Sequence, residues 1–165
     1  MMDVGMNSEW VRNIMACVES PRMRVLWNGK QLDQIVPSRG IRQGDSISPY
    51  LFVLCMERLS HIIKEEVSKG KWKGIRLSRY GPLLTHLFFA DDLVLFSEAS
   101  QEQITIISHC LERFSRASGQ KVSLRKSQIF FSKNVNREVA KRIIDTTGIP
   151  ETMNLGKYLG VPTVH

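Results

Sequence analysis

Two adjacent aspartates, Asp91 and Asp92, constrain the fold more than any other feature, because apolar runs of strand length lie on both sides of them. Residues 83–89 (LLTHLFF) precede the pair and residues 93–97 (LVLFS) follow it. This pattern predicts a β-hairpin whose turn carries two carboxylates. Carboxylate oxygens are ligands that Mg²⁺ accepts. Asp also favours turns because its side chain hydrogen-bonds the local backbone, so a purely structural role stays open.

A glycine-bearing basic loop is predicted upstream, at residues 38–52 (SRGIRQGDSISPYLF). Gly40 and Gly44 allow backbone angles and close approaches that a side chain would block. Ser48 followed by Pro49 predicts an N-cap and a first helical residue. A loop of this kind before a helix N-terminus suits phosphate contact, since free N–H groups and the helix dipole both favour anions. An ordinary capped helix after a glycine loop is the alternative.

Taken together, the two segments resemble the nucleotide-contacting loop and the catalytic hairpin of reverse transcriptases, in the order that this family uses. The similarity is strongest to the enzymes of non-LTR (LINE-type) retrotransposons. Two further stretches agree with that group, residues 118–127 (SGQKVSLRKS) and 157–162 (KYLGVP). A group II intron maturase or a telomerase-like relative shares the hairpin, but residues 118–127 fit those enzymes less well.

The resemblance implies an incomplete polymerase palm, an α+β fold in which helices pack on one face of an antiparallel sheet. We expect one partial reverse transcriptase domain over residues 1–165. Within it, residues 1–37 would form an N-terminal helix and hairpin, residues 38–155 the palm, and residues 156–165 the start of a thumb-proximal segment.

The resemblance also implies roles for individual residues. The expected catalytic residues are Asp91, Asp92 and Lys126, with the two aspartates as metal ligands and Lys126 near the leaving pyrophosphate. The expected nucleotide- or template-binding residues are Arg42, Gln43, Gly44 and Ser48. Phe89 and Ala90 would support the hairpin, and Tyr158, Leu159 and Gly160 would resemble a primer grip. The implied cofactor is Mg²⁺, two ions in the complete enzyme, or Mn²⁺. The implied partners are an RNA template, a DNA or RNA primer, deoxynucleoside triphosphates and an upstream part of the same polyprotein.

One carboxylate of the family's site has no match in this sequence. Polymerases of this kind hold two metal ions with three carboxylates, one of them on a strand before the first helix. Asp3 and Glu9 are the acidic residues at that end, and neither follows a strand-like apolar run. We therefore expect the chain alone to be inactive. The alternative is an inactive retroelement remnant or a non-catalytic nucleic-acid-binding module; the coding sequence upstream of Met1 would separate a truncated gene from a remnant.

The charge of the chain favours a polyanionic partner. Lys and Arg number 23 against 16 Asp and Glu, a net charge of +7, and the pI is about 9.6. Nine of these cations lie between Arg113 and Arg142, where Glu138 is the only acid: they are Arg113, Arg116, Lys121, Arg125, Lys126, Lys133, Arg137, Lys141 and Arg142. This concentration indicates phosphate contact, and a solvated basic face is the alternative.

Several other classes of protein are disfavoured. The three cysteines lack metal-ligand or redox spacing, and the four histidines form no cluster, so we expect neither a disulfide framework nor a zinc site. No apolar run has the length of a membrane span, and the N-terminus lacks the order of a signal peptide. We expect an intracellular protein of the nucleus or cytoplasm, with no membrane partner.

The remaining elements follow from local signals. A helix is predicted to begin at Ser8 and to end before Pro21, and Asn28-Gly29 predicts the tight turn of a hairpin between residues 24–27 and 34–36. The helix after Pro49 should end at Gly70. Ser100 with Gln103 predicts a capping box for a helix that ends at Gly119, with Ile104, Ile107, Leu111 and Phe114 as its buried stripe. Residues 129–131 read as a strand, and Asn136 as the cap of a helix that ends at Gly148.

Overall fold

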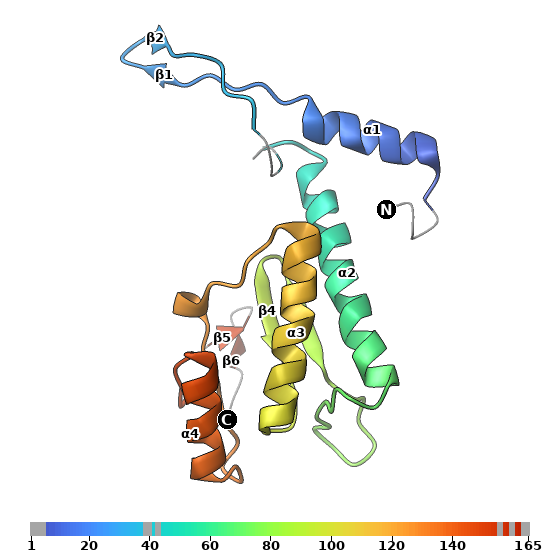
Figure 1. Cartoon of the computed structure of the whole chain (residues 1–165), viewed down its shortest axis with the longest axis vertical. Helices are drawn as coiled ribbons and strands as arrows, with labels where there is room; N and C mark the ends of the chain where they lie inside the picture. The colour runs from blue at the N-terminus through green and yellow to red at the C-terminus, as the bar shows by residue number, and fades with distance from the viewer. Residues whose placement is uncertain (1–5, 38–40, 42–43, 155–156, 159–160, 163–165) are drawn as a thin grey trace. The chain divides into compact units, whose positions relative to one another are not determined.

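A computed structural model describes residues 6–37, 41 and 44–154, and the backbone of residues 157–158 and 161–162 (Figure 1). The helices in these residues are α1 (Ser8–Glu19), α2 (Ser48–Ser68), α3 (Gln101–Ser118), α4 (Arg137–Thr147) and the 3₁₀ turn η2 (Leu124–Lys126). The strands form two-stranded antiparallel sheets: β1 (Leu26–Trp27) with β2 (Lys30–Gln31), β3 (His86–Phe89) with β4 (Asp92–Leu95), and β5 (Lys157–Tyr158) with β6 (Val161–Pro162). Residues 1–52 and 53–165 form two compact units.

The first unit contains the predicted helix and hairpin. The side chain of Asn7 caps α1 by accepting a hydrogen bond of 2.8 Å from the Glu9 amide. Asn28 and Gly29 have φ angles of 48° and 77°, the left-handed pair that a tight hairpin turn requires. Trp27 therefore pairs with Lys30, so the second strand begins directly after the turn, earlier than the predicted residues 34–36.

The start of α2 corrects one detail of the sequence prediction. Ser48 is the first residue of the helix and not its N-cap. The reason is a turn before it, in which the carbonyl of Asp45 accepts the Ser48 amide at 3.1 Å and the Asp45 carboxylate accepts the Ile47 amide at 3.4 Å. These bonds wind the chain before Pro49. The predicted stop is confirmed, since Gly70 has a φ of 68° after the last turn.

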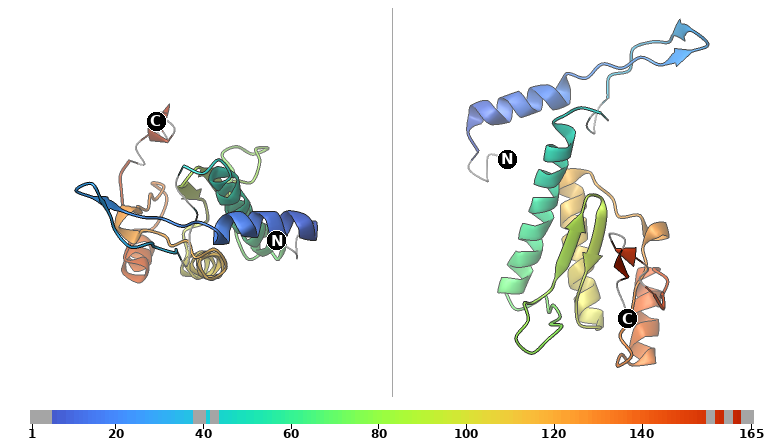
Figure 2. Two further views of the ribbon diagram at one scale, coloured as in Figure 1. Left: turned by 90° about the horizontal axis from the view of Figure 1, so that it is seen from above. Right: turned by 180° about the vertical axis from the view of Figure 1, so that it is seen from behind.

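The hydrophobic core of the second unit lies between α2, α3 and one face of the β3–β4 hairpin (Figure 2). Its buried members are Leu59, Ile62, Ile63, Trp72, Cys110 and Phe114. Phe88 of β3 and Leu93 and Leu95 of β4 pack against this cluster from the hairpin. The indole N–H of Trp72 donates to the Phe96 carbonyl at 3.0 Å. The helices thus cover one face of the hairpin, as the α+β palm prediction requires.

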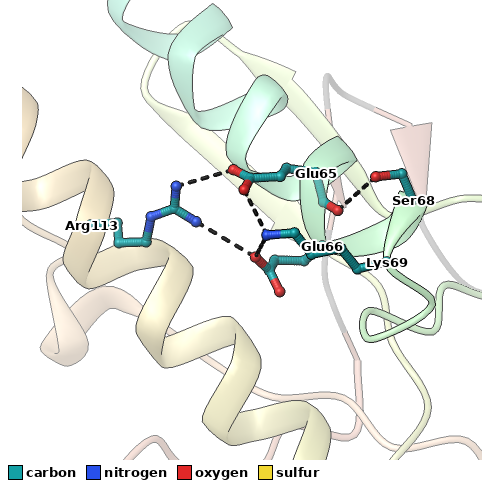
Figure 3. A network of polar contacts seen from close by, with 5 residues as sticks. All are labelled: Glu65, Glu66, Ser68, Lys69 and Arg113. Carbon is teal, nitrogen blue, oxygen red and sulfur yellow. Dashed lines mark hydrogen bonds and ion pairs between the residues drawn. The ribbon is translucent and has the colours of Figure 1, made fainter.

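A network of ion pairs joins α2 to α3 beside this core (Figure 3). Arg113 of α3 lies 3.0 Å from Glu65 and 3.5 Å from the buried Glu66, both on α2. Lys69 lies 2.6 Å from Glu65 and 3.2 Å from Glu66. The hydrogen bonds from Lys69 and then Arg113 lower the pKa of Glu65 to about 2. Because the lowered pKa favours the charged carboxylate, the network persists at neutral pH and is lost only as the pH falls toward that value.

The capping box predicted for α3 forms only in part. The Ser100 hydroxyl accepts the Gln103 amide at 3.2 Å, as predicted. The fully buried Gln103 side chain instead bonds the preceding loop, accepting from the Lys73 amide at 2.8 Å and donating to the Lys71 carbonyl at 2.7 Å. The buried residues of α3 are Gln103, Cys110 and Phe114, and Ile107 and Leu111 of the predicted stripe are only partly buried.

The C-terminal part of the second unit follows the predicted order, with one difference. Asn136 caps α4, and Gly119 and Gly148 end α3 and α4 with φ angles of 73° and 66°. The prediction of a strand at residues 129–131 is wrong. Ile129 makes a single parallel bridge to Glu151. Its amide donates to the Pro150 carbonyl at 3.0 Å, and its carbonyl accepts from the Thr152 amide at 2.8 Å. Within the described part of the chain, the pairing does not extend beyond this one bridge.

Candidate active site

The β3–β4 hairpin places Asp91 at its apex. Phe89 pairs with Asp92, which leaves Ala90 and Asp91 as a two-residue turn. The prediction that both aspartates lie in the turn is therefore wrong for Asp92, which is the first residue of β4. Ala90 has a φ of 48°, an unusual angle for a residue with a Cβ, which costs about 1–2 kcal/mol. Backbone strain of this kind persists where the surrounding structure enforces it, often at functional sites.

Asp92 lies on the face of the hairpin that the helices leave uncovered. In the register of β3 and β4, Phe88 pairs with Leu93, and both point to the core. The next pair, Phe89 with Asp92, points to the other face because side chains alternate along a strand. Phe89 is 53% exposed there. It therefore lies beside Asp92 on the open face, whereas the sequence predicted that it packs beneath the hairpin.

The two aspartates can provide part of a metal site. Both are exposed, adjacent in sequence and free of any ion pair to another described residue. Within residues 6–37, 41 and 44–154, no group of three or more His, Cys, Asp or Glu side chains could hold a metal ion. The donor chemistry thus fits Mg²⁺, a cation that takes carboxylate oxygens, but two ligands leave its coordination incomplete.

The predicted nucleotide loop belongs to the other unit of the chain, residues 1–52. Gly44 has a φ of 85°, and nothing lies within 4 Å of the position that a Cβ would occupy. Glycine is therefore favoured at position 44 by the positive φ angle and not by a close neighbour. Arg42 and Gln43 lie outside the described residues, and Ser48 opens α2.

Lys126 lies on the 3₁₀ turn η2, next to Arg125, and both side chains are exposed. Hydrogen bonds from the Lys126 amide to the Ser123 carbonyl at 2.9 Å and from the Ser127 amide to the Leu124 carbonyl at 3.2 Å fix this turn. Neither cation forms an ion pair with another described residue, so both are available to an anion.

Three of the nine cations between Arg113 and Arg142 are already paired, which corrects the predicted basic surface. Arg113 is held by Glu65 and Glu66, Arg116 lies 2.5 Å from Glu112, and Arg137 lies 2.8 Å from Glu151. The other six, Lys121, Arg125, Lys126, Lys133, Lys141 and Arg142, have no such partner among the described residues. Four of these six unpaired cations lie between α3 and α4, and the other two lie on α4.

Comparison with known proteins decides the family. The family model described as "Reverse transcriptase (RNA-dependent DNA polymerase)" matches residues 1–163. The chain belongs to the reverse transcriptase family.

Two relatives are similar to parts of the chain. An uncharacterised mitochondrial protein of Arabidopsis thaliana is 49% identical over 65 residues, which cover 39% of this chain and 53% of the relative. The retrovirus-related Pol polyprotein from a type-2 retrotransposable element of Drosophila melanogaster is 34% identical over 89 residues, 53% of this chain and 8% of the relative. The chain thus matches about half of the first relative and a small part of the second.

The remaining predicted site residues lie near the C-terminus. Tyr158 belongs to β5, where its backbone pairs with Val161, and Leu159 and Gly160 lie outside the described residues. None of the helices within the described part of the chain is both long and apolar enough to cross a membrane.

The sequence did not predict a polar contact on the core side of the hairpin. His86, on β3, lies 3.0 Å from the hydroxyl of Ser60 on α2 and 2.9 Å from that of Thr85. His86 and Phe88 share one face of the strand by their spacing of two residues, but the sequence predicted Phe89, on the other face, beneath the hairpin, which gave no reason to place His86 toward the core. A histidine at such a position needs hydrogen-bond partners.

Proposed function

We propose that the chain is part of an RNA-directed DNA polymerase of a LINE-type retroelement, and that Asp91 and Asp92 supply two of its three metal-binding carboxylates. The observation that carries this proposal is the placement of Asp91 at the strained apex and Asp92 on the uncovered face of a hairpin, in a chain of the reverse transcriptase family. Assignment to a LINE-type element is supported by the similarity to the Drosophila Pol polyprotein.

The reaction is template-directed nucleotidyl transfer. The 3′-hydroxyl of a DNA or RNA primer loses its proton and attacks the α-phosphorus of a deoxynucleoside triphosphate, and the bond to pyrophosphate breaks. Asp91 would bind both metals and Asp92 would bind less directly or support the site. Bound Mg²⁺, or Mn²⁺, would favour the ionised hydroxyl and neutralise charge on the triphosphate. Lys126 would contact or protonate the leaving pyrophosphate.

The loop before α2 would contact the incoming nucleotide. Gln43 would touch the nucleotide or the paired template base, with Gly44 leaving room for the close approach and Arg42 binding phosphate. Ser48 opens a helix whose N-terminal N–H groups favour anions. In the same arrangement, residues 158–160 would lie at the primer. These roles rest on the family's motif order.

The first prediction concerns the chain by itself. Residues 1–165 should show no Mg²⁺-dependent extension of a DNA primer on an RNA template, because two ligands leave the metals under-coordinated. A fusion that adds the aspartate-bearing strand of a related reverse transcriptase before residue 1 should extend the primer. Robust extension by the chain alone would contradict the need for a third carboxylate. An inactive fusion that still binds the template–primer duplex would favour the non-catalytic module.

The second prediction concerns the nucleic-acid partner. The chain should bind an RNA–DNA duplex with little sequence preference, since phosphate contacts do not read bases. Replacing Arg125 and Lys126 by Ala should flatten the slope of log K against log salt by about 1.4–1.8, the sum for two phosphate contacts at roughly 0.7–0.9 each.

A matched control removes the same charge from cations that are already paired. Arg116→Ala with Arg137→Ala also deletes two positive charges, but these arginines lie 2.5 and 2.8 Å from glutamates. The control should change the salt slope less than the Arg125/Lys126 variant. Equal changes in the two double variants would mean that net charge alone governs binding, and would remove Lys126 from the proposed site.

A further inference from the structure

His86 is held between two hydroxyl groups on the core side of the hairpin. Its Nε2 lies 3.0 Å from Ser60 Oγ on α2, and its Nδ1 lies 2.9 Å from Thr85 Oγ1. The imidazole also stacks on Phe88, with ring centroids 4.6 Å apart and planes tilted by 38°. We call these three residues the Ser60–His86–Thr85 clamp. It ties the strand that leads to Asp91 directly to the long helix α2.

The environment of the clamp favours a neutral imidazole. Burial, and then the positive charge of Lys64, lowers the pKa of His86, while Glu57 acts in the opposite direction. Lys64 and Glu57 both come from α2, and the residue opposite His86 on β4 is the apolar Leu95. A neutral imidazole has one donor and one acceptor nitrogen, and each hydroxyl can serve either. Both ring nitrogens are therefore satisfied without a charge.

The clamp is a structural contact and not a nucleophilic pair. Ser60 is only 6% exposed, so a substrate has no access to its hydroxyl. The adjoining groove of about 400 Å³ is lined by residues 83–86 and by Lys64, Val67 and Ser68 of α2. The clamp joins β3 to α2. Because β3 pairs with β4 as far as the turn, this contact also restrains the tip of the hairpin.

We propose that His86 is a positioning residue for Asp91 and Asp92: the clamp anchors β3 to α2 and so holds the strained hairpin tip, and protonation of the imidazole loosens it. An unfavourable backbone angle such as that of Ala90 persists only where the surroundings enforce it, and the clamp restrains the strand that leads to this residue. This inference rests on the proposed role of the two aspartates for its functional meaning, but its test needs neither nucleotide nor metal.

The test is amide hydrogen exchange, followed by NMR, in the 165-residue chain. His86→Phe keeps a ring against Phe88 and deletes both hydrogen bonds. The amides of residues 87–95 should then exchange roughly tenfold faster, the size expected for losing two hydrogen bonds of modest net strength. Amides of α4 should not change, because the effect is local. Ser60→Ala, which removes the partner on α2, should give the same local increase if His86→Phe fails to fold. His86→Gln should restore part of the protection.

The matched control is His61→Gln, because His61 is a histidine of α2 whose side chain is 48% exposed. It should leave exchange in residues 87–95 unchanged. The pH profile gives the second readout. Since folding lowers the pKa of His86, the hairpin should lose protection as the pH falls below about 6.5, after correction for intrinsic exchange, and His86→Gln should abolish this loss.

Two results would overturn the inference: unchanged exchange of residues 87–95 in both His86→Phe and Ser60→Ala, or an equal increase in the hairpin and in α4. Either result can occur while the fusion enzyme extends primers normally. Failure of the positioning role is therefore distinguishable from failure of the proposed polymerase function.

Discussion

Replacing Asp91 by Asn should abolish primer extension by the fusion that carries the third carboxylate, with a loss of at least about a thousandfold in rate. Asn has nearly the same shape but no charge, and a metal-binding carboxylate contributes several kcal/mol of charge stabilisation, at about 1.4 kcal/mol for each factor of ten. The fold should not change, because Asp91 is exposed at the apex of the hairpin. Single-nucleotide incorporation measures the rate, and thermal unfolding measures the fold.

Two further substitutions control this experiment. Asp145→Asn removes an exposed carboxylate from α4 and should leave the rate unchanged. Asp92→Asn should reduce the rate less than Asp91→Asn, because Asp92 lies on the strand and supports the site from the open face. Retained extension in Asp91→Asn would take this residue out of the active site.

Replacing Ile63 by Ala should lower the free energy of unfolding by about 2–5 kcal/mol. Ile63 has no exposed surface and lies in the cluster that joins α2, α3 and the hairpin. Its loss leaves a cavity at the point where the helices support the strands that carry the aspartates. Urea unfolding followed by circular dichroism gives the free energy from the midpoint and the slope.

The same helix offers a control for this change. Val53 is 62% exposed, so Val53→Ala makes a similar gain in helix propensity without a cavity and should shift the free energy by under about 0.5 kcal/mol. If Ile63→Ala leaves too little folded protein, Ile63→Val should still cost about 0.5–1.5 kcal/mol. Equal effects at positions 53 and 63 would contradict the described core.

The elements that could be predicted from sequence are those whose signals are local. Asn28-Gly29 fixed its own turn, and Asn136 and Gly148 marked the two ends of α4, because caps and left-handed turns depend on a few neighbouring residues. The paired aspartates between apolar runs likewise predicted the β3–β4 hairpin. The glycine loop followed by this hairpin resembles the motif order of reverse transcriptases, and the family match confirms that resemblance.

The details that could not be predicted depend on partners far away in sequence. Gln103 reads as a capping residue, but it bonds the backbone of Lys71 and Lys73, about 30 residues earlier. Arg113 reads as part of a phosphate-binding surface, but Glu65 and Glu66 hold it. The pairing register set the place of Asp92, and composition says nothing about register.

The most direct test of the account is to locate the metal on the polypeptide. Fe²⁺ that replaces Mg²⁺ in the fusion enzyme, with ascorbate and peroxide, cleaves the backbone beside the bound ion, and mass spectrometry identifies the fragments. If the two aspartates hold the metal, cleavage should fall within residues 89–93 and should be removed by excess Mg²⁺ and by Asp91→Asn but not by Asp145→Asn. Cleavage elsewhere, or cleavage of residues 89–93 that persists in Asp91→Asn, would contradict it.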